Sequence, residues 1–157
     1  MDVNSVSIAL GLVVSLAFTE LFGLAAGGMV VPGYIALYLD KPLCILTTIA
    51  AAIATWLIVK SLSKVMIVYG KRRTLLMILV GFLLGAATRV VPAVFAGEPD
   101  LSAALAVGEF AAIGFIIPGL IAIWIDRQGL FETVGAVLTT GVVVRLALIL
   151  VAGEMLA

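Results

Sequence analysis

Long stretches without a charged residue constrain the fold of this chain more than any other feature. Uncharged, mainly apolar runs cover residues 42–59, 74–88 and 133–144. Extended by a few tolerated residues, such runs can form helices of about 20 residues, which cross the roughly 30 Å of bilayer hydrocarbon. The chain is 64% hydrophobic and only 11% charged, whereas a soluble domain is about half apolar and a quarter charged. The sequence therefore predicts an integral membrane protein.

Six apolar segments follow one another along the 157 residues, at 6–24, 27–39, 43–68, 75–95, 101–125 and 130–150. None shows the alternation of apolar and polar residues that a membrane-spanning strand requires. We expect an all-α fold that forms a single transmembrane domain over residues 1–157. The N-terminal region lacks the basic start of a signal peptide, so the first segment is expected to be retained as a span.

A stretch that occurs twice indicates an internal repeat. Residues 30–40 read VVPGYIALYLD and residues 116–126 read IIPGLIAIWID, with identical proline, glycine, isoleucine, alanine and aspartate positions. At the same offset, a basic residue follows each copy. A fixed offset of this kind is the signature of duplicated structure. We expect two halves, about 1–70 and 71–157, with three segments each and with the second and fifth segments broken at Pro-Gly.

The distribution of charge predicts the orientation in the membrane. Basic side chains surround the junction between the halves: Lys60, Lys64, Lys71, Arg72 and Arg73. The loop at 97–100 is acidic. The positive-inside rule places the junction in the cytoplasm and the acidic loop outside.

Three crossings per half would invert the second half and put both termini outside. In the alternative, the Pro-Gly segments are re-entrant, which leaves four full spans and parallel halves. The sequence favours the inverted arrangement.

Several charges lie inside the apolar segments. Each half contributes one acid and one base: Glu20, Lys60, Glu109 and Arg145. A charge at the bilayer centre costs roughly 2.5–3.5 kcal/mol, so each needs a partner or a wet cavity. These side chains either pair and hold helices together or, with Lys64 one turn from Lys60, line a path for a charged substrate. Lys64 and Arg89 lie close to segment ends and are expected to snorkel to the interface.

The duplicated Pro-Gly pairs, Pro32-Gly33 and Pro118-Gly119, allow two interpretations. Proline and glycine are common in transmembrane helices and can simply kink them. Matched interrupted segments in two halves are also the best sequence indication of a binding site in repeat transporters. The free N–H groups of a broken helix suit an anionic group. The duplication favours the second interpretation.

Composition excludes several kinds of chemistry. The chain has no histidine and one cysteine, so a catalytic unit with histidine is impossible and a buried transition-metal site is disfavoured. No phosphate-binding glycine-rich loop is present. We expect no catalytic residue, no metal, no cofactor and no nucleic-acid partner. The turn at Lys71, Arg72 and Arg73 either sets topology or docks an acidic or nucleotide-using partner.

Four stretches carry a resemblance to a known family. They are SLAFTE at 15–20, GGMVVPGYIALYLDKP at 27–42, KVMIVYGKRR at 64–73 and IGFIIPGLIAIWIDRQGL at 113–130. In length, order and content the chain resembles the PgsC/CapC capsule-biosynthesis family, the membrane subunit of bacterial poly-γ-glutamate synthesis. The resemblance covers nearly the whole chain.

This resemblance implies a multi-pass protein of the bacterial cytoplasmic membrane, surrounded by lipid, in a complex that makes and exports an anionic polymer. In that family a cytoplasmic ATP-dependent ligase of the PgsB/CapB type extends poly-γ-glutamate. The membrane subunit is thought to anchor the ligase and help pass the polymer to an outer-face partner of the PgsA/CapA type. No catalytic residue is carried over.

The residues themselves fit this role. A polyanion needs basic groups along its route, and Lys60, Lys64 and Arg145 are available, with Arg89 as a further candidate. A chain this small is expected to form a homo-oligomer or to share a pore with a partner. The alternatives are a purely structural membrane anchor and a small inverted-repeat transporter of an ion or solute.

Overall fold

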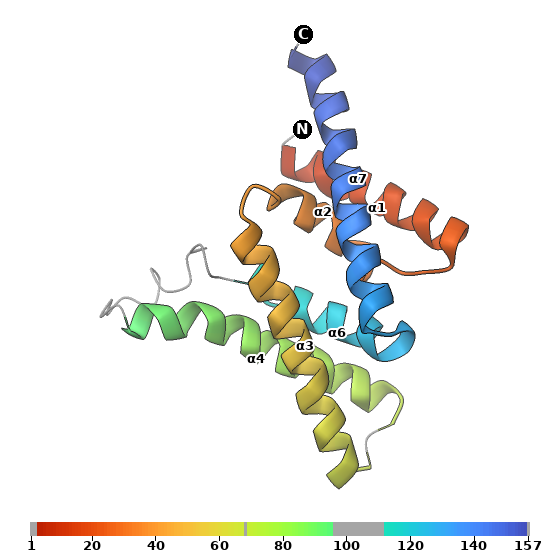
Figure 1. Ribbon diagram of the computed structural model, residues 1–157. Coiled ribbons are helices and arrows are strands. Elements are labelled where there is room, and N and C mark those ends of the chain that lie inside the picture. Colours follow the sequence, from red (N-terminus) through yellow and green to blue (C-terminus); the bar gives the residue numbers. More distant parts are fainter. Residues whose placement is uncertain (1–2, 68, 96–111, 157) are drawn as a thin grey trace. The chain divides into compact units, whose positions relative to one another are not determined.

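The computed structural model of the protein describes residues 3–67, 69–95 and 112–156. All regular structure in these residues is helical (Figure 1). The helices are α1 (Val3–Phe22), α2 (Val31–Leu37), α3 (Pro42–Val65), α4 (Lys71–Phe95), α6 (Ile117–Gln128) and α7 (Leu130–Leu156). The prediction of an all-α protein is confirmed for this part of the chain.

Four of the described helices are long and apolar enough to cross a membrane by length and composition: Ser5–Phe22, Pro42–Val65, Lys71–Val91 and Leu130–Val151. Each coincides with one of the long apolar segments in the sequence. Their interiors are uncharged or nearly so, and their mean hydropathy lies between 1.9 and 2.3. A lipid bilayer is the environment that solvates such surfaces, because lipid tails cover exposed apolar side chains.

The two remaining helices are short and start at the Pro-Gly pairs. α2 has 7 residues and α6 has 12, which correspond to about 10 and 18 Å. Proline is suited to the first turn, where no hydrogen bond from its nitrogen is needed. The pairs thus open these helices, and the irregular backbone lies before them, at 23–30 and 112–116. Neither short helix reaches the roughly 30 Å of a full crossing by itself, so a third crossing in each half would have to include the irregular backbone before the helix.

The described residues form two compact units. The terminal unit combines Met1–Asp40 with Trp124–Ala157 and contains α1, α2, the end of α6 and α7. The central unit is Lys41–Ile123 and contains α3, α4 and the beginning of α6. Each unit therefore draws helices from both sides of the predicted boundary near residue 70.

The core of the terminal unit lies where α1, α2 and α7 meet. Ala36 of α2 and Val144 and Leu148 of α7 are buried there. One face of α1 covers them with side chains four residues apart: Val6, Leu10 and Val14. A spacing of four residues places side chains on one side of a helix, so this face of α1 points to the core.

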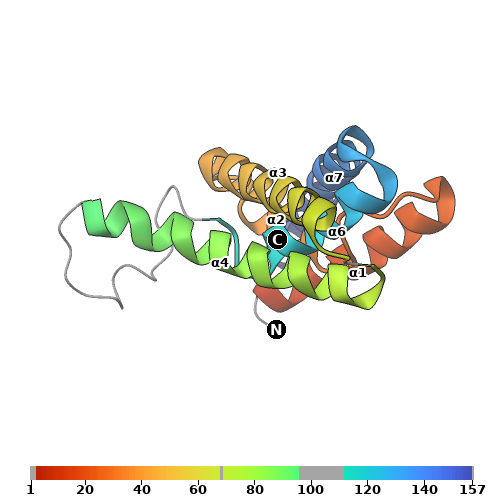
Figure 2. The same cartoon turned by 90° about the horizontal axis from the view of Figure 1, so that it is seen from below.

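The core of the central unit is apolar as well. α3 packs against α4 (Figure 2). Val59 of α3, Met77 of α4 and Ile123 of α6 are buried together. Partly buried side chains surround them: Trp56, Leu76, Ile78, Val80 and Leu120.

Candidate functional site

The first Pro-Gly pair lies in a close contact between α1 and α2. A β-carbon at Gly11 would lie 2.6 Å from both Cα and N of Gly33. The hydroxyl of Ser7 donates a buried hydrogen bond of 2.9 Å to the carbonyl of Gly33. Ser7, Gly11 and Ser15 are four residues apart and form a small-residue stripe on α1. Such stripes allow transmembrane helices to pack backbone against backbone.

The same contact occurs in the central unit between α4 and α6. A β-carbon at Gly81 would clash with Cα and N of Gly119. One turn further along α4, a β-carbon at Gly85 would lie 3.1 Å from the carbonyl oxygen of Phe115. Gly81 and Gly85 form a GxxxG motif, which permits close helix approach.

Both Pro-Gly pairs are buried. In each unit the glycine of the pair faces a helix glycine, Gly11 opposite Gly33 and Gly81 opposite Gly119. Larger residues would separate the helices at these points. This geometry supports the packing interpretation of the pairs. Their contact with an anionic ligand stays a prediction.

Polar side chains hold the irregular backbone before α2. Gln128, at the end of α6, donates from Nε2 to the carbonyl of Ala25 at 2.6 Å. Its Oε1 accepts from the Ala25 N–H at 3.1 Å. Gly27 and Gly28 take positive φ values of 73° and 112°, which residues with a side chain rarely adopt. Since irregular backbone at membrane depth must find partners inside the protein, Gln128 supplies two of them.

Three side chains hold the corresponding backbone before α6. Thr48 of α3 accepts a hydrogen bond from the Ile113 N–H at 2.8 Å. Thr88 of α4 accepts one from the Ala112 N–H at 3.2 Å. The neighbouring Arg89 donates from Nη2 to the Ala112 carbonyl at 3.1 Å. This part of the chain is thus tied to both long helices of the central unit.

The prediction that Arg89 snorkels to the interface is wrong. Its side chain is buried, with 9% of the residue exposed. The guanidinium lies 4.2 Å from the ring centre of Phe115 and also binds the Ala112 carbonyl. A carbonyl oxygen and an aromatic face both stabilise a cation. These contacts offset the cost of removing Arg89 from water.

Arg145 is paired with an acid that the sequence did not assign as a partner. Its Nη2 lies 2.9 Å from both carboxylate oxygens of Asp40. Its Nη1 donates to the carbonyl of Ala36 at 3.3 Å. Arginine commonly binds the last carbonyls of a helix, where the helix dipole is negative. Arg145 therefore fastens the C-terminal end of α2 to α7. The one signal in the sequence that singled out Asp40 was its recurrence as Asp126 in the repeated stretch.

The other predicted charges have different surroundings. Lys60 and Lys64 are exposed on α3, and the Lys60 ammonium lies 4.3 Å from the ring centre of Trp56. Glu20 is exposed near the end of α1. Glu109 lies outside the described residues. The contacts of the terminal unit join Arg145 to Asp40 and not to Glu20.

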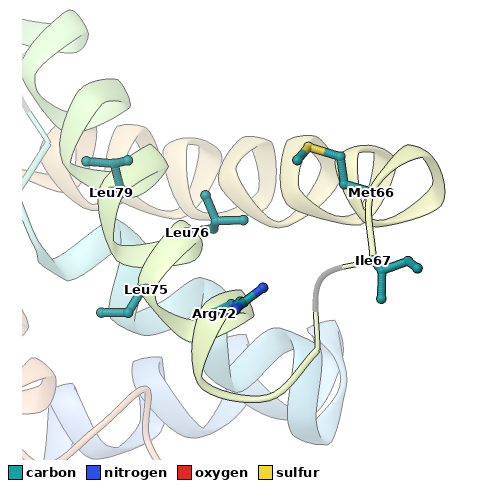
Figure 3. Close-up of a pocket in the computed structure, with 6 residues that line it drawn as sticks. All are labelled: Met66, Ile67, Arg72, Leu75, Leu76 and Leu79. Atoms are coloured by element: carbon teal, nitrogen blue, oxygen red, sulfur yellow. The ribbon is translucent and has the colours of Figure 1, made fainter.

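The basic turn lies beside an apolar groove. Lys71 and Arg72 are exposed and Arg73 is half-buried in the first turn of α4. A groove of about 360 Å³ lies next to this turn (Figure 3). Its lining residues are Met66, Ile67, Arg72, Leu75, Leu76 and Leu79. Arg72 is thus the only member of the basic turn among the residues that line this groove.

Together, the helices and contacts define a class of protein. Each unit combines long apolar helices with a short helix, or part of one, that begins at Pro-Gly, and hydrogen bonds from side chains hold the backbone before the short helices. Among the described residues, no group of three histidine, cysteine, aspartate or glutamate side chains is arranged to hold a metal ion. This is the architecture of a helical membrane protein.

Sequence comparisons identify the family within that class. The family model for capsule biosynthesis CapC matches residues 10–134. The PGA biosynthesis protein CapC of Bacillus subtilis (strain 168) is 38% identical over 134 residues, which are 85% of each chain. The capsule biosynthesis protein CapC of Bacillus anthracis is 37% identical over 131 residues, 83% of each chain. The chain belongs to the CapC capsule-biosynthesis family, as its motifs indicated. No solved structure matches it.

Proposed function

We propose that this chain is the membrane subunit of a bacterial complex that makes and exports poly-γ-glutamate. The observation that carries the proposal is the match to the CapC family model over residues 10–134. Two relatives are named for PGA biosynthesis and for capsule biosynthesis. The four apolar helices support a place in a membrane, which we propose is the cytoplasmic membrane of a bacterium.

In this proposal the chain anchors a PgsB/CapB-type ligase on the cytoplasmic side and meets a PgsA/CapA-type subunit on the outer side. The turn at Lys71, Arg72 and Arg73 is the proposed docking point for the ligase. Lys71 and Arg72 are exposed, and cationic groups steer the encounter with an acidic surface. The positive-inside rule also places this turn in the cytoplasm.

The proposed polymer route uses the exposed lysines of α3. Lys60 and Lys64 are one turn apart and therefore share a helix face. Both side chains are exposed, so they are available to carboxylates of the polymer. Arg145 is already engaged by Asp40 and Ala36, which supports a packing role for it. A homo-oligomer, or a pore shared with a partner, would enclose the route.

The repeat enters the proposal as well. The contact of Gly11 with Gly33 and that of Gly81 with Gly119 have the same local geometry. This likeness supports descent of the two helix pairs from one duplicated element. We propose that the halves are inverted with respect to the membrane, as the charge distribution predicts.

Complementation tests the proposal directly. A bacterial strain that has lost its own CapC-type subunit should regain surface poly-γ-glutamate when it expresses this chain. The double variant Lys60→Ala with Lys64→Ala should lower the polymer on the surface, while the ligase still sediments with the membrane. Lys41→Ala is the matched control, because Lys41 is an exposed lysine beside the opposite end of α3.

Two results would count against parts of the proposal. Full surface polymer in the double lysine variant would remove the conduit role. Restoration of polymer by a ligase fused to an unrelated membrane anchor would reduce the chain to a structural anchor. Failure of the unmodified chain to restore any polymer, despite normal membrane levels in a strain with both partner subunits, would contradict the proposed function as a whole.

A further inference from the structure

The start of α4 carries an unfavourable concentration of positive charge. Lys71, Arg72 and Arg73 occupy its first turn, which contains no acidic residue. The N-terminal end of a helix is already positive because of the helix dipole, and cations there destabilise it. The sequence from 41 to 95 contains no aspartate or glutamate. By contrast, α7 has Glu132 in its first turn. An anion bound at the exposed Arg72 would offset positive charge at this end of α4.

Along α4, the cationic Arg72 is followed by the apolar lining residues Leu75, Leu76 and Leu79 (Figure 3). Arg72, Leu76 and Leu79 follow the spacing that places side chains on one face of a helix. Met66 and Ile67, which follow α3, line the groove as well. The distance from position 72 to position 79 along the axis of α4 is about 10 Å.

The apolar lining is open to the surroundings. Leu75 is 66% exposed, and Ile67 is 84% exposed. Exposed apolar groups at the edge of a transmembrane helix are normally covered by lipid or by another protein. The guanidinium of Arg72 makes this groove selective, because arginine binds phosphate oxygens with two donors at once. Basic pockets on the cytoplasmic side of membrane helices are typical sites for anionic headgroups.

We propose that this groove binds one anionic phospholipid of the cytoplasmic leaflet. Its phosphate lies on the guanidinium of Arg72, and one acyl chain follows Leu75, Leu76 and Leu79 toward the bilayer interior. The order of the side chains along α4 matches the order of groups in the lipid. Arg72 would bind the phosphate at the membrane surface, and the leucines that follow it would contact the hydrocarbon below. The bound phosphate offsets the unfavourable position of the Arg72 cation at the positive end of the helix dipole. The site does not depend on polymer synthesis.

Lipid retention by the purified full chain tests this site. The protein is extracted in mild detergent, and phosphatidylglycerol or phosphatidylcholine is added at equal concentration. Native mass spectrometry counts the bound lipids, and thermal unfolding reports stabilisation. The unmodified chain should retain one phosphatidylglycerol and unfold at a higher temperature with it than with phosphatidylcholine. Inorganic phosphate alone should give neither effect.

Matched variants separate the groove from general attraction to charge. Arg72→Gln should weaken phosphatidylglycerol retention about tenfold, since it removes a charge-assisted hydrogen bond. Lys71→Gln removes the same charge from the same turn, but Lys71 does not line the groove, so retention should stay near that of the unmodified chain. Leu79→Trp fills the groove without a change in charge and should also displace the lipid.

Several outcomes would overturn the proposal. Equal losses in Lys71→Gln and Arg72→Gln would indicate diffuse attraction without a site. Unchanged retention in Leu79→Trp would exclude the groove, and this variant decides the question even if Arg72→Gln fails to fold. If Arg72→Gln retains the lipid but no longer copurifies with the ligase, the groove serves a protein partner. A stabilisation by inorganic phosphate equal to that by phosphatidylglycerol would remove the role of the acyl chain.

Discussion

The two units use the same contact between helix backbones but surround it with different chemistry. In the terminal unit Gly11 meets Gly33, and in the central unit Gly81 meets Gly119. The third helix of the terminal unit, α7, adds the apolar side chains of Val144 and Leu148 and the ion pair of Arg145. In the central unit the third helix, α3, adds the apolar side chain of Val59 and the hydroxyl of Thr48, which accepts a hydrogen bond from the Ile113 N–H, but no ion pair among the contacts described above. The contact between glycines determines how closely the two helices approach, whereas the side chains that stabilise this contact differ between the units.

The largest expected effects come from filling the glycine contacts. Gly11→Ala and Gly81→Ala should each destabilise the protein by about 2–3 kcal/mol, because the new methyl group meets backbone that cannot yield cheaply. Unfolding in detergent micelles measures the loss. Gly135→Ala is the control, since no atom lies within 4 Å of a β-carbon there; it should be neutral or slightly stabilising. If only one of the two contact variants is destabilised, the two contacts are not equivalent.

Arg89→Gln should have the next largest effect, about 2 kcal/mol, because it removes the bond to the Ala112 carbonyl and the contact with Phe115. The same unfolding measurement applies. Lys64→Gln, which removes an exposed cation from α3, should change stability little. A loss for Arg89→Gln no larger than that for Lys64→Gln would contradict the buried position of Arg89.

Thr48→Val should cost about 1–2 kcal/mol, since the buried N–H of Ile113 loses its acceptor without a change in side-chain shape. Thr47→Val is the adjacent control. Among the described residues, the hydroxyl of Thr47 binds carbonyls of its own helix, those of Leu43 and Cys44, so its removal should matter less. Equal losses for the two threonines would show that the bond to Ile113 does not contribute to stability.

The ion pair of the terminal unit should give the smallest effect. Its Asp40 side chain is 71% exposed, and exposed ion pairs contribute at most about 1 kcal/mol. A double-mutant cycle with Arg145→Met and Asp40→Asn should give a coupling of that size or less. Arg145→Met alone should cost somewhat more than Asp40→Asn, because it also frees the Ala36 carbonyl. A coupling well above this value would mean that the pair is shielded by another chain or by lipid.

The positions of the long helices were predictable because uncharged runs of sufficient length have few alternatives to a transmembrane helix. Small residues four positions apart, Ser7, Gly11 and Ser15 in α1 and Gly81 and Gly85 in α4, are a further signal in the sequence, which the predictions above did not use. The sequence does not show which segment each stripe meets. The repeat indicated that Pro32-Gly33 and Pro118-Gly119 have a distinct role. Their burial and their contacts with helix glycines support a role in packing.

The partners of the buried polar groups could not be predicted from local pattern. Arg89 is close to a segment end, so snorkelling was the simpler expectation. Its partner Ala112 is 23 residues away, on backbone whose course the pattern does not define. Asp40 was part of the repeated stretch, but its pairing with Arg145 depends on α7 packing beside α2. Such long-range choices are decided by packing, which a single sequence does not display.

The composition of the terminal unit has a consequence for its biogenesis. Gln128 binds Ala25 across 103 residues, and Arg145 binds Asp40 across 105, whereas the bond between Thr48 and Ile113 spans 65. Because a ribosome synthesises a chain from the N-terminus to the C-terminus, α1 and α2 are made before α7. They cannot complete their contacts until α7 has been made. The contacts within the central unit can form during this interval. Within the terminal unit, α1 and α2 are therefore made before the central unit but complete their contacts after it.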